Sequence, residues 1–216
     1  SVVKLPDGRV ISADSVILAT GGMSYPLTGS TGDGYKMAQK LGHTVTELKP
    51  SLVPLCIHEG FCTKIAGLSL KNVTLSIFET GKKKPLFFEM GEMLFTHFGI
   101  SGPLVLSASS HIRYMGKKEY TAFVDLKPAL TTEQLDNRIL RDFGEEQNKD
   151  FANSLSKLLP KSLIPVIIKL SGIKSDKKVN QIEREERLGL CKLIKAVPLH
   201  ITGFRPIEEA IITSGG

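Results

Sequence analysis

The sequence has little of what marks several specialised classes of protein. It has only three cysteines in 216 residues, Cys56, Cys62 and Cys191. That number is odd and too small for a disulfide scaffold, so a reducing cytoplasm is the expected compartment. No apolar run approaches the ~20 residues that a membrane-spanning helix needs. The first residues also lack the layout of a signal peptide, so nothing supports export or membrane insertion.

The composition is that of an ordinary globular protein. Hydrophobic residues make up 41% and charged residues 23%, which excludes a disordered or fibrous chain. The length fits one large domain or two to three small ones. Lys and Arg number 28 against 22 Asp and Glu, giving a net charge of +6. This mild excess permits nucleic acid as a partner without demanding it, and mixed signs such as those of residues 183–187 indicate a solvated helix face.

Two apolar runs near the ends of the sequence each lead into a pair of glycines. Residues 14–20 form an almost continuous apolar run before Gly21-Gly22, and residues 210–214 form another before Gly215-Gly216. Such runs are typical of strands that are covered on both faces, as in a parallel sheet. A parallel sheet needs more strands than two, so we expect the sequence to be an internal piece of a longer protein.

Between these runs the pattern changes from short strands to helices. The charged turns after residue 55 predict a small antiparallel barrel or sandwich, covered by a helix that starts at Gly102-Pro103. From Thr131 the period becomes helical and opens with a capping-box pattern, Thr131 to Gln134. The expected elements are a hairpin (2–11), a strand (14–20), a helix (31–41) capped by Thr31 or Asp33, an extended segment (45–55), strands (68–78, 84–89, 92–96, 120–126), helical patterns (from 131, from 151, 162–170, 183–195) and a strand (197–203).

A glycine-rich stretch, residues 21–34, is the first candidate site. It follows the apolar run and precedes a helix, where backbone N–H groups can hold phosphate. It matches neither the G-x-G-x-x-G nor the P-loop pattern. A tight loop with glycines at positive φ and a cofactor contact therefore both remain open.

Two further groupings favour a structural interpretation. His97 lies near Ser101, yet no G-x-S-x-G elbow is present and no acidic residue is placed to orient the histidine. Cys56, His58 and Cys62 are metal ligands by type, but they have no partner pair downstream and zinc usually takes four ligands. We expect a loop at the first and buried or incidental cysteines at the second.

Several long motifs together are similar to one family. Residues 16–26 and 29–35 resemble the bacterial BaiN/YhiN-like flavoproteins, which are NAD(P)/FAD-dependent oxidoreductases. The match continues in the family's order through residues 50–55, 67–73, 91–103 and 209–216, whereas the helical block matches only loosely.

The resemblance implies a Rossmann-like FAD domain interrupted by an inserted barrel and helices. The expected fold class is α+β: a small antiparallel barrel-like domain and a helical subdomain, flanked by remnants of the FAD domain. The implied parts are a remnant with a hairpin, strand and helix (1–50), the barrel-like insert (51–128), the helical subdomain (129–196) and the returning strands (197–216). The family's strand, G-x-G-x-x-G turn and helix are absent here, as is its C-terminal segment, so these missing parts are the first expected partners.

The resemblance also implies the cofactor contacts. In the family the Ala-Thr-Gly-Gly turn approaches FAD with its backbone, which carries over to Ala19, Thr20, Gly21 and Gly22, because a Cβ at the glycines would block that approach. The re-entering segment should lie near the flavin too; its residues are Thr213, Ser214, Gly215 and Gly216.

The implied chemistry passes a hydride from NAD(P)H to FAD and on to an acceptor, with no metal, and the insert covers the flavin and shapes the substrate site. Members of the family act on steroid-type bile acid intermediates or on uridine in ribosomal RNA, so both a small molecule and RNA stay open as substrate. The resemblance assigns no catalytic side chain, and we expect the isolated chain to be inactive. The alternative is a non-catalytic interaction or RNA-binding module of a larger protein.

Overall fold

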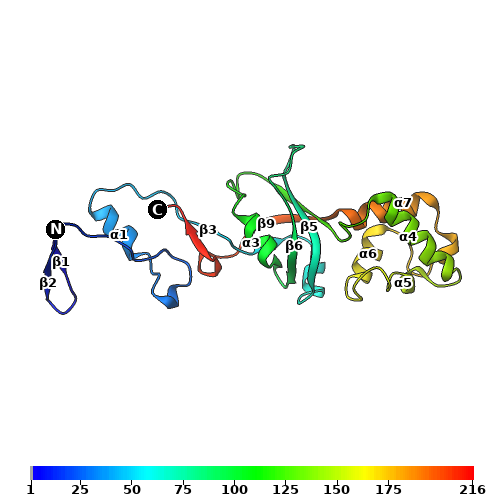
Figure 1. Cartoon of the computed structure of the whole chain (residues 1–216), viewed down its shortest axis with the longest axis horizontal. Coiled ribbons are helices and arrows are strands. Elements are labelled where there is room, and N and C mark those ends of the chain that lie inside the picture. Colours follow the sequence, from blue (N-terminus) through cyan, green and yellow to red (C-terminus); the bar gives the residue numbers. More distant parts are fainter. Residues whose placement is uncertain (1) are drawn as a thin grey trace.

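The structure is a computed structural model that describes residues 2–216. Figure 1 shows an elongated molecule with three parts in a row. The N-terminal segment and the C-terminal strand lie at one end, a barrel lies in the middle, and a group of helices lies at the other end. The C-terminus lies close to β3 (Lys49–Ser51), so the chain leaves this end of the molecule and returns to it.

Six antiparallel strands close into the central barrel, in the order β4-β7-β6-β5-β8-β9. Alternate side chains of its strands are buried, as in Tyr120, Ala122 and Val124 of β8, because successive residues of a strand point to opposite faces. The predicted strands 84–89 and 92–96 are one strand, β6. The barrel strands are β4 (Leu55–Ile57), β5 (Ser69–Glu79), β6 (Phe87–Thr96), β7 (Gly99–Ser101), β8 (Tyr120–Asp125) and β9 (Val197–Phe204).

Two short helices belong to the barrel. Helix α3 (Pro103–Ser109) begins at the predicted Gly-Pro pair and buries Leu104, Val105 and Ala108. Helix α2 (Phe61–Lys64) follows β4 and buries Cys62. Proline is tolerated in the first turn of α3 because the N–H it lacks has no partner within the helix there.

The helical subdomain contains α4 (Thr132–Glu145), α5 (Phe151–Ser154), α6 (Ile164–Ser171), the short η2 (Val179–Gln181) and α7 (Arg184–Lys195). The capping box at the start of α4 is confirmed, with Thr131 and Gln134 each bonded to the other's backbone N–H. The pattern from residue 151 gives only the single-turn α5, although its apolar residues are buried as expected. Arg187 of α7 binds Asp136 of α4 at 2.6 Å, so the two helices are joined at their partly buried faces.

Barrel and helices share one continuous cluster of buried apolar side chains. The cluster runs from Leu55 in β4 through the barrel interior to Ile167 in α6 and Ile194 in α7. The predicted α+β class, an antiparallel barrel with a helical subdomain, is therefore confirmed. The boundaries of the expected domains stay a prediction.

The N-terminal part contains little regular structure. The predicted hairpin is present as β1 (Val2–Lys4) and β2 (Val10–Ser12). It is followed by the short η1 (Pro26–Thr28) and helix α1 (Asp33–Lys40). Helix α1 begins after Gly32 at φ +77° without a side-chain cap, so neither Thr31 nor Asp33 caps it. Its Met37 and the following Leu41 are exposed rather than packed.

The predicted strand over residues 14–20, the strand of the expected 1–50 unit, is wrong for this chain. These residues have no regular secondary structure and pair with no strand among residues 2–216, and Ile17 is 91% exposed. A buried-type strand forms only when neighbouring strands satisfy its backbone groups and cover its side chains. The described residues supply no such neighbours.

The second apolar run also differs from its prediction. It forms β10 (Ile212–Ser214), preceded by η3 (Ile207–Glu209), and β10 pairs antiparallel with β3 in a two-stranded sheet. Ile211 and Ile212 are about half exposed. The prediction of a strand covered on both faces was therefore wrong. Among the described residues, β10 pairs only with β3, which lies in the extended segment predicted at 45–55.

Candidate functional site

The structure brings the two predicted glycine turns together although 190 residues separate them. The backbone N–H of Met23 donates to Oγ1 of Thr213 at 2.8 Å, and the hydroxyl of Ser24 lies 3.1 Å from the same atom. At the end of the second turn, the N–H of Gly216 donates to Oγ1 of Thr46 at 3.1 Å. One polar side chain, that of Thr213, therefore holds the first turn against the returning strand.

A pocket of about 290 Å³ opens where the two turns meet. Its lining combines hydroxyl groups with the edge of β10 and consists of Gly22, Ser24, Ser30, Tyr35, Ile211, Ile212 and Thr213. A second pocket of about 290 Å³ lies across Tyr35, between α1 and residues 45–48. Of the eight predicted cofactor-binding residues, Gly22 and Thr213 line the first pocket and none lines the second.

The glycines are required by close approaches within the chain itself. A Cβ at Gly22 would stand 2.6 Å from Oγ1 of Thr213. Gly21 has φ +74°, and a Cβ there would stand 3.0 Å from Oγ of Ser30. Gly215 has φ +95°, and a Cβ there would clash with the carbonyl oxygen of Glu47. The tight-loop interpretation therefore holds for these positions, and the cofactor contact stays a prediction beside it.

The backbone before the pocket is free to bind a ligand. Among the described residues, no N–H group of residues 13–22 donates a hydrogen bond. Thr20 and Gly21 are exposed residues and directly precede the pocket-lining Gly22 in the chain. Free N–H groups beside a surface without a Cβ fit the edge of a dinucleotide cofactor. The pocket volume of about 290 Å³ lies just below the range for ligand sites, about 300–1,000 Å³, so these residues can hold only part of FAD.

A charged group stands where the barrel meets the β3–β10 sheet. Both ends of the Arg205 guanidinium bind Glu209, with Nη2 to Oε1 at 2.6 Å and Nε to Oε2 at 3.0 Å. The guanidinium also lies 4.6 Å from the ring centre of Phe98. The hydrogen bonds to Glu209 raise the pKa of Arg205, and those from Arg205 lower the pKa of the Glu209 carboxyl. The arginine is therefore charged and held in one orientation, with 29% of its side chain exposed.

The stretch that contains His97 is a tight turn between β6 and β7. Gly99 approaches the backbone of Leu55 and Ile57 too closely for any other residue. Ser101 pairs with Leu94 in the barrel, and no hydrogen bond joins it to His97 in the part of the chain that the structure describes. The structure thus gives this motif a role in closing the barrel and in placing Phe98 under Arg205.

The cysteines differ in exposure. Burial, followed by the charge of Glu59, raises the pKa of Cys62 to about 12, and burial, followed by the charge of Asp136, raises that of Cys191 to about 11. Cys56 is half-buried, with its Sγ 3.8 Å from the carbonyl oxygen of Phe204.

Within residues 2–216, no group of three or more His, Cys, Asp or Glu side chains is arranged to hold a metal ion. The same residues include no helix that is both long and apolar enough to cross a membrane.

Comparison with known proteins defines the class. Residues 49–212 match the family model described as the HI0933-like protein barrel and H2TH domain. The match covers the whole barrel and helical subdomain of Figure 1, so the chain belongs to the HI0933-like family. The fold it implies, a barrel joined to helices, is the fold observed.

Three curated relatives match nearly the whole chain. The 3-dehydro-bile acid delta(4,6)-reductase of Clostridium scindens is 30% identical over 97% of this chain and 51% of its own length. The ribosomal RNA dihydrouridine synthase of Escherichia coli is 28% identical over 97% and 50%, and that of Haemophilus influenzae 32% over 94% and 47%. The chain therefore spans about half the length of the curated relatives it matches. Their names agree with the oxidoreductase resemblance, and the expected BaiN/YhiN-like family is confirmed.

Some residues of the site were not predicted from the sequence. Ser24 and Ser30 lie within the predicted glycine-rich stretch 21–34, but Tyr35, which also lines the pocket, and Thr46, which accepts from the N–H of Gly216, were not singled out. Arg205 and Glu209 were missed as well, although their spacing of four residues was a visible signal for an ion pair. What could not be seen was that Phe98, more than 100 residues earlier, provides the surface under the arginine.

Proposed function

We propose that the protein to which this chain belongs is a cytoplasmic, NAD(P)H-dependent FAD oxidoreductase that reduces a carbon–carbon double bond. The observation that carries the proposal is the meeting of the two glycine turns in one pocket, beside backbone N–H groups that have no partner among the described residues. The relatives' names support the type of reaction. A delta(4,6)-reductase and a dihydrouridine synthase both add hydrogen across a double bond of their substrate.

The residues of this chain would bind and orient the cofactor. The backbone of Ala19–Gly22 would hold one edge of FAD, and Thr213 would fix the position of that turn. When bound, FAD would supply the hydride-transfer chemistry between the nicotinamide and the acceptor. The parts of the FAD domain that the resemblance finds missing here would supply the remaining contacts, and the insert would cover the flavin and exclude water.

Arg205 is the residue of the insert best suited to bind the acceptor. The position of its guanidinium is fixed by Glu209 and by the ring of Phe98, at the barrel end that joins the β3–β10 sheet. A guanidinium N–H group held in position can donate a hydrogen bond to an oxygen that gains negative charge when a conjugated double bond accepts a hydride. We propose that Arg205 holds such an oxygen of the substrate.

The test uses the full-length protein. After purification we expect a flavin spectrum that bleaches under anaerobic addition of NADH or NADPH. Arg205→Gln should keep the bound flavin and its reduction by the nicotinamide but slow transfer to the acceptor by about 10²-fold or more. Arg9→Gln, which removes an exposed arginine that is likewise paired with a carboxylate, that of Asp7, is the matched control. A purified protein without flavin, or one that no nicotinamide reduces, would refute the proposal.

The alternative is a non-catalytic interaction or RNA-binding module. It predicts a parent sequence without an upstream strand followed by G-x-G-x-x-G, whereas the oxidoreductase requires that motif. The parent gene therefore separates the two functions.

A further inference from the structure

Three hollows follow one another along the junction of the barrel and the helical subdomain. The largest, about 690 Å³, lies between α2 and α6 and is lined by Glu59, Gly60, Phe61, Lys64, Ile65, Ser162, Pro165, Val166, Lys169 and Leu170. The next two, about 260 and 370 Å³, share Asn72, Leu126 and Lys127. The linings of the first and second hollows come from neighbouring stretches of the sequence, which are separated only by residues 66–68 in one case and by Lys161 in the other. We call this line of hollows the junction groove.

The junction groove is lined by positive charge that nothing among the described residues neutralises. Its four lysines are Lys64, Lys71, Lys127 and Lys169, and none of them forms an ion pair among residues 2–216. Its one carboxylate, Glu59, is bound by the ring and the backbone N–H of His200.

Elsewhere in the helical subdomain, Lys149, Lys157, Lys177 and Lys178 each bind a carboxylate at 2.7–2.8 Å. Lys161, Lys174 and Lys192 have no ion-pair partner among the described residues, but none of them lines these hollows. What distinguishes the junction groove is therefore that four unpaired lysines line one series of hollows.

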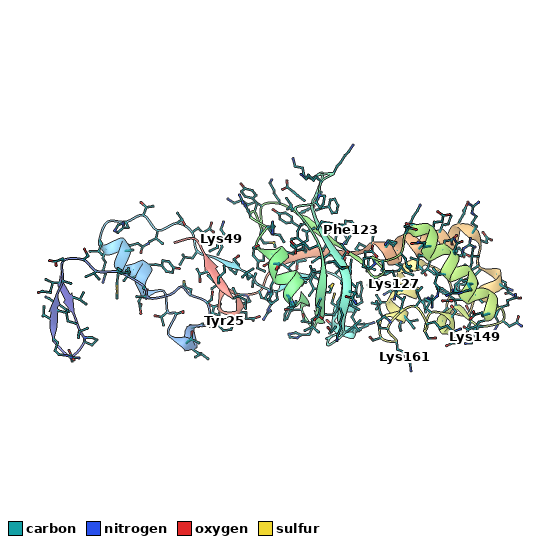
Figure 2. The ribbon with its side chains drawn as sticks, in the orientation of Figure 1. Tyr25, Lys49, Phe123, Lys127, Lys149 and Lys161 are labelled. Atoms are coloured by element: carbon teal, nitrogen blue, oxygen red, sulfur yellow. The ribbon has the colours of Figure 1, made fainter. Side chains whose placement is uncertain are left out.

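Lys127 is the clearest case. Figure 2 places it at the narrow connection between the barrel and the helices. Burial, and then repulsion by Arg138, lower the pKa of its amine. A half-buried ammonium group without a counter-ion gains free energy when an anion enters beside it. The groove is thus complementary to a ligand that carries several negative charges.

The largest hollow adds an apolar surface. Phe61 is partly exposed there, next to Ile65 and Val166, and Lys64 and Lys169 stand in the same lining. Proteins that bind single-stranded nucleic acid combine a positively charged groove for the backbone with aromatic rings on which bases stack. The volume of about 690 Å³ lies within the range of small-molecule sites and leaves room for an unstacked base.

We propose that the junction groove binds a single-stranded segment of RNA, with phosphates at Lys64, Lys71, Lys127 and Lys169 and a base against Phe61. The inference rests on the proposed function in one respect, because it names RNA as the substrate class that the reductase would hold. Two relatives named as ribosomal RNA dihydrouridine synthases support that choice.

The test measures binding of the 216-residue chain to a fluorescein-labelled 20-nucleotide oligouridylate by anisotropy, over a range of salt concentrations. We expect saturable binding that weakens as salt rises. The double variant Lys64→Gln/Lys169→Gln should bind roughly tenfold more weakly at 0.1 M salt and reduce the slope of log K against log salt by about 1.4, or 0.7 for each phosphate that the variant no longer neutralises. Phe61→Leu should weaken binding while leaving that slope unchanged.

The matched control is Lys82→Gln/Lys83→Gln. It removes the same charge from the β5–β6 turn, which projects from the top of the barrel in Figure 1, and neither lysine has an ion-pair partner among the described residues. The control should bind within about twofold of the parent chain. Thermal melting of every variant checks that it is folded, and Lys127→Gln offers an independent junction variant if the double variant unfolds.

Equal losses in the junction and control variants would overturn the proposal, since they would show a general effect of charge. No saturable binding, equal affinity for polyglutamate, or preference for a duplex of the same length would overturn it too. The outcomes are distinct from those of the proposed function. If the groove binds RNA but the full-length protein contains no flavin, the RNA site is supported and the proposed reductase function is refuted. If the full-length protein is a flavoenzyme but the groove binds no RNA, the reductase function is supported and the RNA site is refuted.

Discussion

Gly21 illustrates how one residue can serve the chain and a ligand at once. Its φ of +74° and the hydroxyl of Ser30, 3.0 Å from where a Cβ would lie, already require glycine. Its N–H donates no hydrogen bond among the described residues, and the next residue, Gly22, lines the pocket that we assign to FAD. Substitution separates these roles if the variants are chosen in pairs.

In the full-length protein, Gly21→Val should lose most of the bound flavin while the insert stays folded. A branched side chain resists positive φ and would occupy the space of the cofactor. Gly29→Val is the matched control, because Gly29 has φ +99° in the same loop but nothing within 4 Å of its Cβ position. The ratio of flavin to protein absorbance measures the result. Equal loss from both variants would assign the effect to backbone strain alone.

The three thiols should react at very different rates. With pKa values near 12 and 11, Cys62 and Cys191 hold almost no thiolate at pH 8, and both are buried. The half-buried Cys56 should therefore be the one group that a thiol reagent titrates in the native chain. All three should react in denaturant, and Cys56→Ser should abolish the native reaction. Because the native pKa values are raised, any reaction of the other two should increase as the pH rises. Two or more fast thiols at pH 8 would contradict this.

At the scale of elements, local sequence patterns predicted what local interactions decide. The capping box at Thr131 and the helix start at Pro103 were both predicted, because a cap depends on residues within one turn. The apolar run at 14–20 failed because a strand depends on partners that the described residues do not contain. The pattern from residue 151 predicted burial correctly but not helix length, since apolar spacing fixes which side faces the core and not how long the helix runs.

Thr131→Ala should lower the free energy of unfolding by about 1 kcal/mol, because the N–H of Gln134 loses its side-chain acceptor and the reciprocal bond is weakened. Urea denaturation followed by circular dichroism measures the change. Thr132→Ala, one residue further on and inside the helix, is the control and should change stability little. A loss at position 132 as large as that at 131 would argue against the cap.

At the scale of the whole molecule, two features were beyond the sequence. The junction groove draws its lysines from α2, β5, the β8–α4 connection and α6, segments that no local pattern connects. The sequence predicted that positive and negative charges are mixed on the helical block. The ion pairs of its lysines agree with that prediction, whereas the lysines at its junction with the barrel have no carboxylate partner among the described residues. The meeting of the glycine turns was expected only from the family resemblance, because 190 residues separate Met23 from Thr213.

The shared core predicts how the chain responds to protease. Residues from about 52 to 205 contain one continuous buried cluster, whereas most of residues 2–50 are exposed. Limited trypsin digestion should therefore trim both ends and leave the barrel and helices as one resistant fragment, with no FAD required. Mass spectrometry of the fragments gives the boundaries. Rapid cleavage between barrel and helices would show that the shared core does not hold them together.

The chain by itself should bind no FAD tightly and should have no oxidoreductase activity. Tight binding in a Rossmann-like fold uses a glycine-rich turn that delivers the pyrophosphate to a helix N-terminus, with an acidic residue ~20 positions on at the ribose. The 216 residues contain no G-x-G-x-x-G, and the backbone at residues 19–22 follows a segment that pairs with no strand among residues 2–216. The pocket of about 290 Å³ fits only part of the cofactor.

Titration of the chain with FAD, followed by flavin fluorescence, distinguishes weak binding from loss of cofactor during preparation. We expect no saturable change up to high micromolar FAD, because the turns at Gly22 and Thr213 supply contacts to one edge only. Adding back the remaining parts of the FAD domain as a separate polypeptide should restore binding if those parts complete the site. The Gly21→Val chain is the control and should fail to respond even then. Micromolar binding by the unmodified chain alone would show that the two turns and their pocket hold FAD without any further strand.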